Sequence, residues 1–213
     1  AALKRGEDPF RSRRGDHWRT FAHGRRNLAA RVYLPESAPS EGMPLVVALH
    51  GAGGDENFLF ELAGDGHIKR LADRHGCLVV CPLTPDFMFS GRPCLSLLKG
   101  IAGAYPYDAE AVYVLGHSMG AMATAKIAGW HSARLAGAAC VAGFTSTETE
   151  SLPITVVAGE LDRIVSFAGV EAAAKESAKE GRSVTFHPLA DQGHTLLLPQ
   201  AMDLVFEDWF RDR

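Results

Sequence analysis

The fold of this chain is decided by the stretch Val112-Tyr113-Val114-Leu115-Gly116-His117-Ser118-Met119-Gly120-Ala121-Met122-Ala123. It begins as an apolar, β-branched run, passes through a Gly-x-Ser-x-Gly pentapeptide and continues into an alanine-rich segment typical of a helix. A buried strand that turns sharply into a helix needs glycine at its tightest points, because glycine tolerates close backbone approach and strained dihedral angles. The stretch therefore predicts a strand–turn–helix unit with Ser118 at the tip of the turn.

A chance Gly-Ser-Gly turn is the alternative interpretation of the pentapeptide. In a chain with 22 glycines the pentapeptide alone would arise by accident in about one sequence in ten. The apolar run before it and the helical segment after it supply the context that a chance match lacks. We therefore interpret the stretch as a nucleophile elbow, which exposes a reactive serine hydroxyl above a sheet.

Length and composition indicate one globular α/β domain. The chain has 213 residues, of which 46% are hydrophobic and 22% charged, and this suits a single sizeable core. We expect residues 17–213 to form that domain and residues 1–16 to form a basic N-terminal arm. No apolar run approaches the roughly 20 residues of a membrane span, so no membrane-spanning segment is expected.

The net charge of −3 hides an asymmetry between the two parts of the chain. Residues 1–26 carry eight Lys and Arg against three Asp and Glu, whereas the remainder carries fourteen against twenty-two. We interpret the basic head as a solvated arm and expect no nucleic-acid partner, because no basic stripe or nucleic-acid module follows. The sequence leaves the compartment open between the cytoplasm and export with a leader removed, and it does not indicate an oligomeric state.

The four cysteines, Cys77, Cys81, Cys94 and Cys140, are too few for a disulfide framework in a domain of this size. Cys77 and Cys81 lie about 13 Å apart in one expected strand, so they cannot bridge each other. Cys94 could pair with another cysteine in an oxidising compartment. No metal-binding pattern occurs, and we expect neither a metal nor a cofactor.

Short apolar runs alternate with helical patterns along the chain, which predicts a mostly parallel sheet with helices on both faces. Glu56–Arg74 has helical spacing that Gly64 and Gly66 interrupt. The amphipathic helix Ala168–Glu180 is expected to end at Gly181. The expected strands are 17–21, 27–34, 45–49, 77–81, 112–117, 135–142, 154–158 and 183–188, and the other expected helices are 95–104, 119–130 and 199–211.

Four groups follow expected strands directly, at the edge of a parallel sheet where ligands bind. They are the turn His50-Gly51-Ala52-Gly53-Gly54, Ser118, Asp162 and His194. A serine hydroxyl needs a base within hydrogen-bonding reach, and that base needs a carboxylate on its far ring nitrogen. We assign these roles to His194 and Asp162, with Glu160 and Asp191 as rival carboxylates.

The remaining groups of the expected site surround this triad. The N–H groups of Met119 and Ala52 are expected to bind the oxyanion of a tetrahedral intermediate. His50 is interpreted as shaping the turn 50–54 that carries Ala52, which we call the oxyanion turn, and His117 cannot act as base for its neighbour Ser118. Candidate walls of the substrate site are Phe58, Phe87, Phe89, Phe144 and Leu196, and for each of them burial in the core is the alternative interpretation.

These motifs resemble the α/β-hydrolase superfamily, and within it the compact esterases of the phospholipase/carboxylesterase, dienelactone hydrolase and polyhydroxybutyrate-depolymerase-like groups. The resemblance rests on the segments 50–54, 116–120, 159–165 and 193–194, and it runs from about Leu45 to the C-terminus. It implies a Ser118–Asp162–His194 triad with Ala52 and Met119 at the oxyanion, acting on carboxylic esters through an acyl-enzyme.

One departure from the pattern of these families bears on the expected substrate. No insertion between Ala142 and Pro153 is long enough for a lid domain, so small or short-chain esters are expected as substrates in preference to long lipids. Thioesterase, peptidase and lactonase activities stay open, because the triad is common to all of them and specificity lies in the loops. A non-catalytic binding protein that kept the fold is the remaining alternative.

Overall fold

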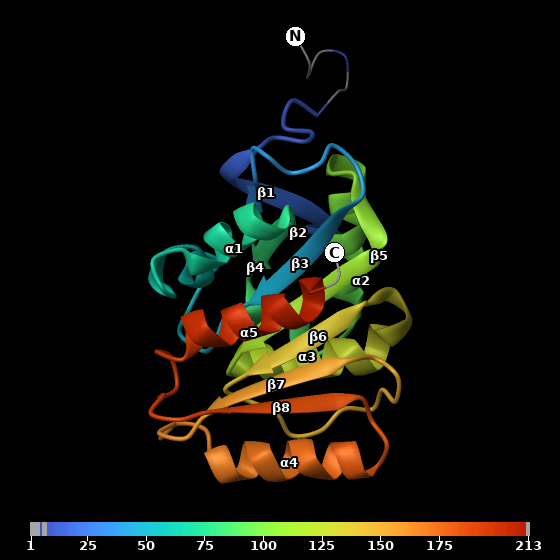
Figure 1. Ribbon diagram of the computed structural model, residues 1–213. Helices are drawn as coiled ribbons and strands as arrows, with labels where there is room; N and C mark the ends of the chain where they lie inside the picture. The colour runs from blue at the N-terminus through green and yellow to red at the C-terminus, as the bar shows by residue number, and fades with distance from the viewer. Residues whose placement is uncertain (1–4, 6–7, 212–213) are drawn as a thin grey trace.

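The computed structural model describes residue 5 and residues 8–211 of the chain. These residues form an 8-stranded sheet in the order β1-β2-β4-β3-β5-β6-β7-β8, in which only β2 runs against the others (Figure 1). The expected mostly parallel sheet is confirmed. Its strands are β1 (Gly15–His23), β2 (Arg26–Leu34), β3 (Met43–Leu49), β4 (Leu78–Pro82), β5 (Tyr107–His117), β6 (Gly137–Val141), β7 (Ile154–Gly159) and β8 (Val184–Leu189).

Helices cover both faces of the sheet, as the alternating pattern predicted. α1 (His67–His75) and α5 (Leu198–Phe210) pack on one face, and α2 (Arg92–Ala104), α3 (Met119–His131) and α4 (Phe167–Lys179) pack on the other (Figure 1). Three short helical segments complete the fold: the π-helical turn η2 (Phe58–Leu62) and the 3-10 turns η3 (Thr84–Phe87) and η4 (Ser132–Arg134). No described helix combines the length and the apolar character needed to cross a membrane.

The glycines that the sequence pattern singled out lie where helices are interrupted or end. Gly64 and Gly66 have φ of +63° and +68°, and they separate η2 from α1 within the segment predicted as an interrupted helix. Gly181, with φ of +83°, follows α4 and donates its N–H to the carbonyl of Ala178. A left-handed residue at this position is an ordinary helix stop, and glycine adopts it without a steric penalty.

The N-terminal strand begins earlier than its sequence pattern indicated. β1 starts at Gly15, which pairs with Leu34, so it overlaps the expected arm by two residues. Arg14 Nη1 donates to the carbonyls of Pro35 and Ala38 at 2.6 and 3.0 Å. This part of the basic head is thus held against the β2–β3 connection. Residues 1–4 and 6–7 of the expected arm lie outside the described residues.

All four cysteines are free and buried. Burial raises the pKa of the Cys77, Cys94 and Cys140 thiols to about 12 and that of Cys81 well above its usual value. Each of these side chains is therefore a protonated thiol at neutral pH and packs as a small apolar group.

Candidate active site

The backbone turns sharply at Ser118. β5 ends at His117 and α3 begins at Met119, while Ser118 between them has φ of +56° and ψ of −114°. An L-residue in this region is strained by about 1–3 kcal/mol, and the surroundings must hold it there. One such constraint is the N–H of Ser118, which donates to the carbonyl of Val141 on β6 at 2.8 Å. The strand–turn–helix unit predicted from the pentapeptide is present.

The two glycines of the pentapeptide allow contacts that any side chain would prevent. A Cβ at Gly116 would lie 2.1 Å from the carbonyl oxygen of Gly120. A Cβ at Gly120 would lie 2.2 Å from the carbonyl oxygen of Leu49, at the end of β3. These backbone contacts seat the first turn of α3 directly on the sheet, which fixes the height of Ser118 above the strands.

A continuous chain of hydrogen bonds joins three residues that are far apart in sequence. The imidazole of His194 lies with Nε2 2.9 Å from Ser118 Oγ and with Nδ1 2.7 Å from Asp162 Oδ2. A carboxylate accepts only, so Nδ1 carries the proton and Nε2 is free to accept the hydroxyl proton. The structure therefore brings together the serine, the histidine and the carboxylate that the sequence placed after β5, β8 and β7.

The Asp162 carboxylate is held in its charged form. Burial alone would raise its pKa, but the hydrogen bond from His194 and the N–H groups of Val165 and Ile164 outweigh burial and lower the pKa. The side chain of Asp162 is 2% exposed. The rival carboxylate Asp191 lies on a left-handed backbone, with φ of +58°. The carboxylate that contacts the ring of His194 is that of Asp162.

Two backbone segments flank Ser118 at the expected oxyanion position. Met119 is the first residue of α3, so its N–H has no partner within the helix. The turn carrying Ala52 approaches so closely that a Cβ on Gly51 would lie 3.3 Å from Ser118 Cβ. His50 stabilises this turn, because its Nδ1 donates to the Gly51 carbonyl at 2.8 Å and its Nε2 accepts from the N–H of Thr84 at 3.0 Å.

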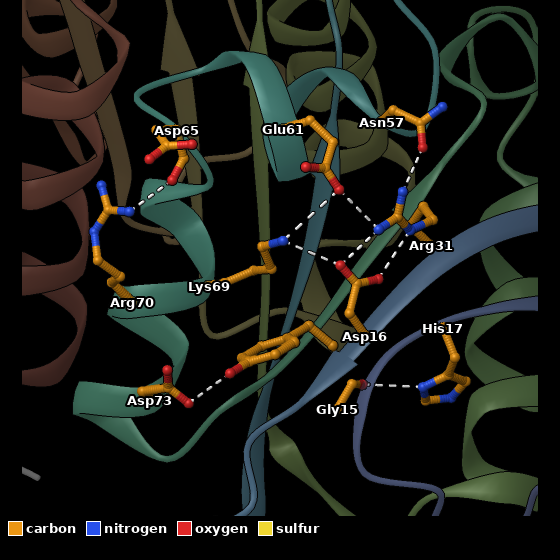
Figure 2. Close-up of polar contacts among 11 residues, drawn as sticks. Gly15, Asp16, His17, Arg31, Asn57, Glu61, Asp65, Lys69, Arg70 and Asp73 are labelled. Carbon is orange, nitrogen blue, oxygen red and sulfur yellow. Dashed lines mark hydrogen bonds and ion pairs between the residues drawn. The ribbon is translucent and has the colours of Figure 1, made fainter.

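An ion-pair network secures the segment that follows the turn 50–54. Figure 2 shows Arg31 on β2 facing Asp16 on β1 and, on its other side, Asn57 and Glu61 from the segment around η2. Arg31 Nε lies 2.9 Å from Asp16 Oδ1, and Nη2 lies 3.0 Å from Glu61 Oε1. This network ties η2 to the edge of the sheet and so fixes Phe58, its first residue, beside the site.

The expected wall residues separate into two groups. Phe87 and Phe144 were expected to face the substrate, and the structure corrects this: they are 0% and 3% exposed and belong to the hydrophobic core. Phe87 ends η3 and turns inward, and Phe144 packs beneath α3. Phe89 and Leu196, at 88% and 83% exposed, stay available for contact, and Phe58 is half-buried.

His117 is a residue whose role sequence reasoning missed. Its Nε2 lies 2.7 Å from the backbone carbonyl of His194, and its ring lies 5.8 Å from that of Phe58. The only sequence signal was its place inside the pentapeptide, next to Ser118. Within the described part of the chain, no group of three or more His, Cys, Asp or Glu side chains is arranged to hold a metal ion.

The chain has the α/β-hydrolase fold. This follows from the order of the strands, from the strand–turn–helix elbow at Ser118 and from comparison with solved structures. A thermostable esterase superposes with a TM-score of 0.74 over 92% of this chain and 62% of that chain, at 23% identity. FphF, a fluorophosphonate-binding serine hydrolase of Staphylococcus aureus, superposes with a TM-score of 0.77 over 93% of this chain and 100% of that chain, at 13% identity.

Sequence comparison adds one curated relative. The chain is 26% identical over 180 residues to "Putative esterase NocK" of Nocardia uniformis subsp. tsuyamanensis, a match that covers 74% of this chain and 52% of the relative. The chain thus spans about half the length of this relative. A scan against models of protein families found no match.

Proposed function

We propose that this protein is a serine hydrolase that cleaves carboxylic esters through an acyl-enzyme. The observation that carries the proposal is the unbroken chain of hydrogen bonds from Asp162 through His194 to Ser118, at a strained elbow. Ser118 is the nucleophile, His194 the general base and acid, and Asp162 the group that orients the ring and stabilises the imidazolium. The names of the structural neighbours and of the curated relative, which are esterases and a serine hydrolase, support the same reaction.

The reaction proceeds in two halves. His194 Nε2 takes the hydroxyl proton as Ser118 Oγ attacks the ester carbonyl carbon, and the carbonyl electrons move onto oxygen. The N–H groups of Met119 and Ala52 stabilise this oxyanion, each by about 2.7–4 kcal/mol. When the intermediate collapses, the alcohol leaves with the proton from Nε2. Water then gives a proton to Nε2 and attacks the acyl carbon, and the second collapse returns that proton to Ser118 Oγ and releases the acid.

The substrates we propose are small or short-chain esters. The connection between β6 and β7, residues 142–153, contains no helix, so this position carries no lid domain over the site. Phe58, Phe89 and Leu196 are the proposed contacts with the substrate, and two of them are largely exposed. Open walls of this kind give little apolar cover to a long acyl chain.

Acyl-chain length provides the test of this preference. Each methylene buried in an apolar pocket contributes about 0.8 kcal/mol, which is roughly fourfold in kcat/KM. We expect kcat/KM on p-nitrophenyl esters to stop rising beyond about four acyl carbons, because further methylenes stay in solvent. A rise of about fourfold per methylene up to twelve carbons would contradict the short-chain preference. A matched thioester series shows whether the ester or the thioester is the better substrate.

A further inference from the structure

We propose that His117 is a positioning residue for the base: its Nε2–H holds the backbone carbonyl of His194 and keeps that imidazole aligned with Ser118. This inference rests on the proposed function and adds a residue to its machinery. The hydrogen bond of His117 goes to the main chain of His194, whereas Ser118 and Asp162 contact the ring of His194. His117 acts through the main chain of His194, so it is distinct from the Ser–His–Asp chain itself.

The contacts of His117 place it between two parts of the site. Its Nε2 lies 2.7 Å from the His194 carbonyl oxygen, and its ring centroid lies 4.8 Å from that of His194. On another side its ring stacks with Phe58 at 5.8 Å and an interplanar angle of 17°. A Cβ on Gly51 would lie 2.8 Å from its Nδ1, so the oxyanion turn also packs against it. His117 is 3% exposed and fills the space between the β8–α5 loop, which carries His194, and the oxyanion turn.

The protonation state follows from these partners. A carbonyl oxygen only accepts, so Nε2 of His117 carries the proton and donates it. Nδ1 is buried and has no hydrogen-bond partner in the described structure, which suits a deprotonated nitrogen. Burial lowers the pKa of His117 to about 4, and the hydrogen bond to the His194 carbonyl, which favours the protonated ring, offsets burial only in part. The ring is therefore neutral at the pH where an esterase works, and it keeps one fixed donor.

His194 stands on a loop that needs such a support. The loop joins β8 to α5, and two residues before His194 the backbone carbonyl of Gln192 accepts from the N–H of Leu161 at 2.9 Å. At His194 itself the main-chain carbonyl is held by His117. A ring fixed only at its two nitrogens can still move with its backbone, and a displacement of about 1 Å can cost about 10²-fold in rate. The His117 hydrogen bond removes this freedom.

Two substitutions of His117 distinguish the effect of its N–H donor from that of its flat ring. His117→Phe keeps a flat ring but has no donor, whereas His117→Gln keeps an N–H near the position of Nε2. We expect kcat on p-nitrophenyl acetate to fall about 10- to 100-fold in His117→Phe, with KM changed less than about threefold. His117→Gln should keep kcat within about threefold of the wild type. Rates are expressed per folded molecule, with the folded fraction taken from denaturant unfolding curves.

His131 offers a matched control. Its Nε2 also lies 2.9 Å from a backbone carbonyl, that of Gly91, but this contact joins the end of α3 to the start of α2. His131→Phe should leave kcat per folded molecule unchanged. If His117→Phe keeps kcat within about threefold, or if His117→Gln loses as much as His117→Phe, the positioning role is wrong.

The acid stability of the protein provides a second readout. The pKa of His117 is about 4 in the folded state and 6.5 without the fold, so only the unfolded state binds this proton between those values. Folding is therefore favoured above pH 6.5, and this share of stability is lost as the pH falls to about 4. The unfolding equilibrium constant should rise on the order of 300-fold from this group. His117→Gln should lack that component, and an unchanged pH slope would contradict the buried neutral ring.

An NMR measurement separates this inference from the proposed function. The Nδ1 proton of His194, which is bonded to Asp162, should exchange faster with solvent in His117→Phe than in the wild type or in His117→Gln. This result needs no turnover, so it tests the positioning role even if the wild-type chain hydrolyses no ester. Equal exchange rates in the three proteins would overturn the positioning role and leave the proposed function standing. Absence of wild-type esterase activity would overturn only the latter.

Discussion

Ser118→Ala should abolish hydrolysis of p-nitrophenyl acetate, with a loss in kcat that approaches about 10⁶-fold. The substitution removes the atom that forms the acyl-enzyme, while His194, Asp162 and the backbone N–H groups keep their places. Any residual rate comes from binding and oxyanion stabilisation alone. The measurement is steady-state hydrolysis at saturating ester, with the purified variant at a concentration high enough to detect the residual rate.

A matched serine controls for loss of fold. Ser151→Ala changes an exposed serine before β7, at the edge of the sheet opposite the site, and it should leave kcat unchanged. If Ser118→Ala retains hydrolysis above about one per cent of the wild type, then the nucleophile lies elsewhere and the proposed reaction is wrong.

Asp162→Asn should reduce kcat by about 10⁴-fold. The amide is close in shape to the carboxylate, so the elbow and the loop should remain folded. It carries no charge to stabilise the imidazolium that forms when Ser118 gives up its proton. It can also present an N–H to His194 Nδ1, which would favour the tautomer that cannot accept from the hydroxyl. The measurement is kcat and KM on the same ester, with KM expected to change little.

Asp191→Asn is the control for this substitution. Asp191 is the rival carboxylate, and its backbone is left-handed at φ +58°, a conformation that asparagine also tolerates. We expect its kcat to stay within about twofold of the wild type. A large loss in Asp191→Asn together with a small one in Asp162→Asn would transfer the role of orienting group to Asp191.

The local elements of the fold could be predicted because their signals are themselves local. The apolar run Met43–Leu49 is buried at every position, as a strand covered on both faces requires. Gly64 and Gly66 interrupt a helical pattern at the place where the backbone becomes left-handed. The insertion of β2 between β1 and β4, by contrast, depends on pairings across the sheet that no periodicity within one strand encodes.

The residues of the candidate site divide in the same way, into those that a local signal predicts and those whose place depends on distant contacts. Ser118, Asp162 and His194 could be selected because each follows a strand, and parallel strands end at one edge of the sheet. Phe87 and Phe144 were placed wrongly, because whether a loop side chain turns to the solvent or to the core depends on the helices around it. The contact from His117 to the His194 carbonyl arises only when a strand end meets a distant loop.

The most direct test of the central claim is covalent labelling of the nucleophile. The folded wild-type protein is treated with a fluorophosphonate, and the modified residue is located by peptide mass spectrometry. We expect one phosphonyl group per molecule on Ser118, no label in Ser118→Ala, and strongly slowed labelling in a variant of His194. A protein that takes up no label, or a label on any other residue, would contradict the proposal that Ser118 is an activated nucleophile.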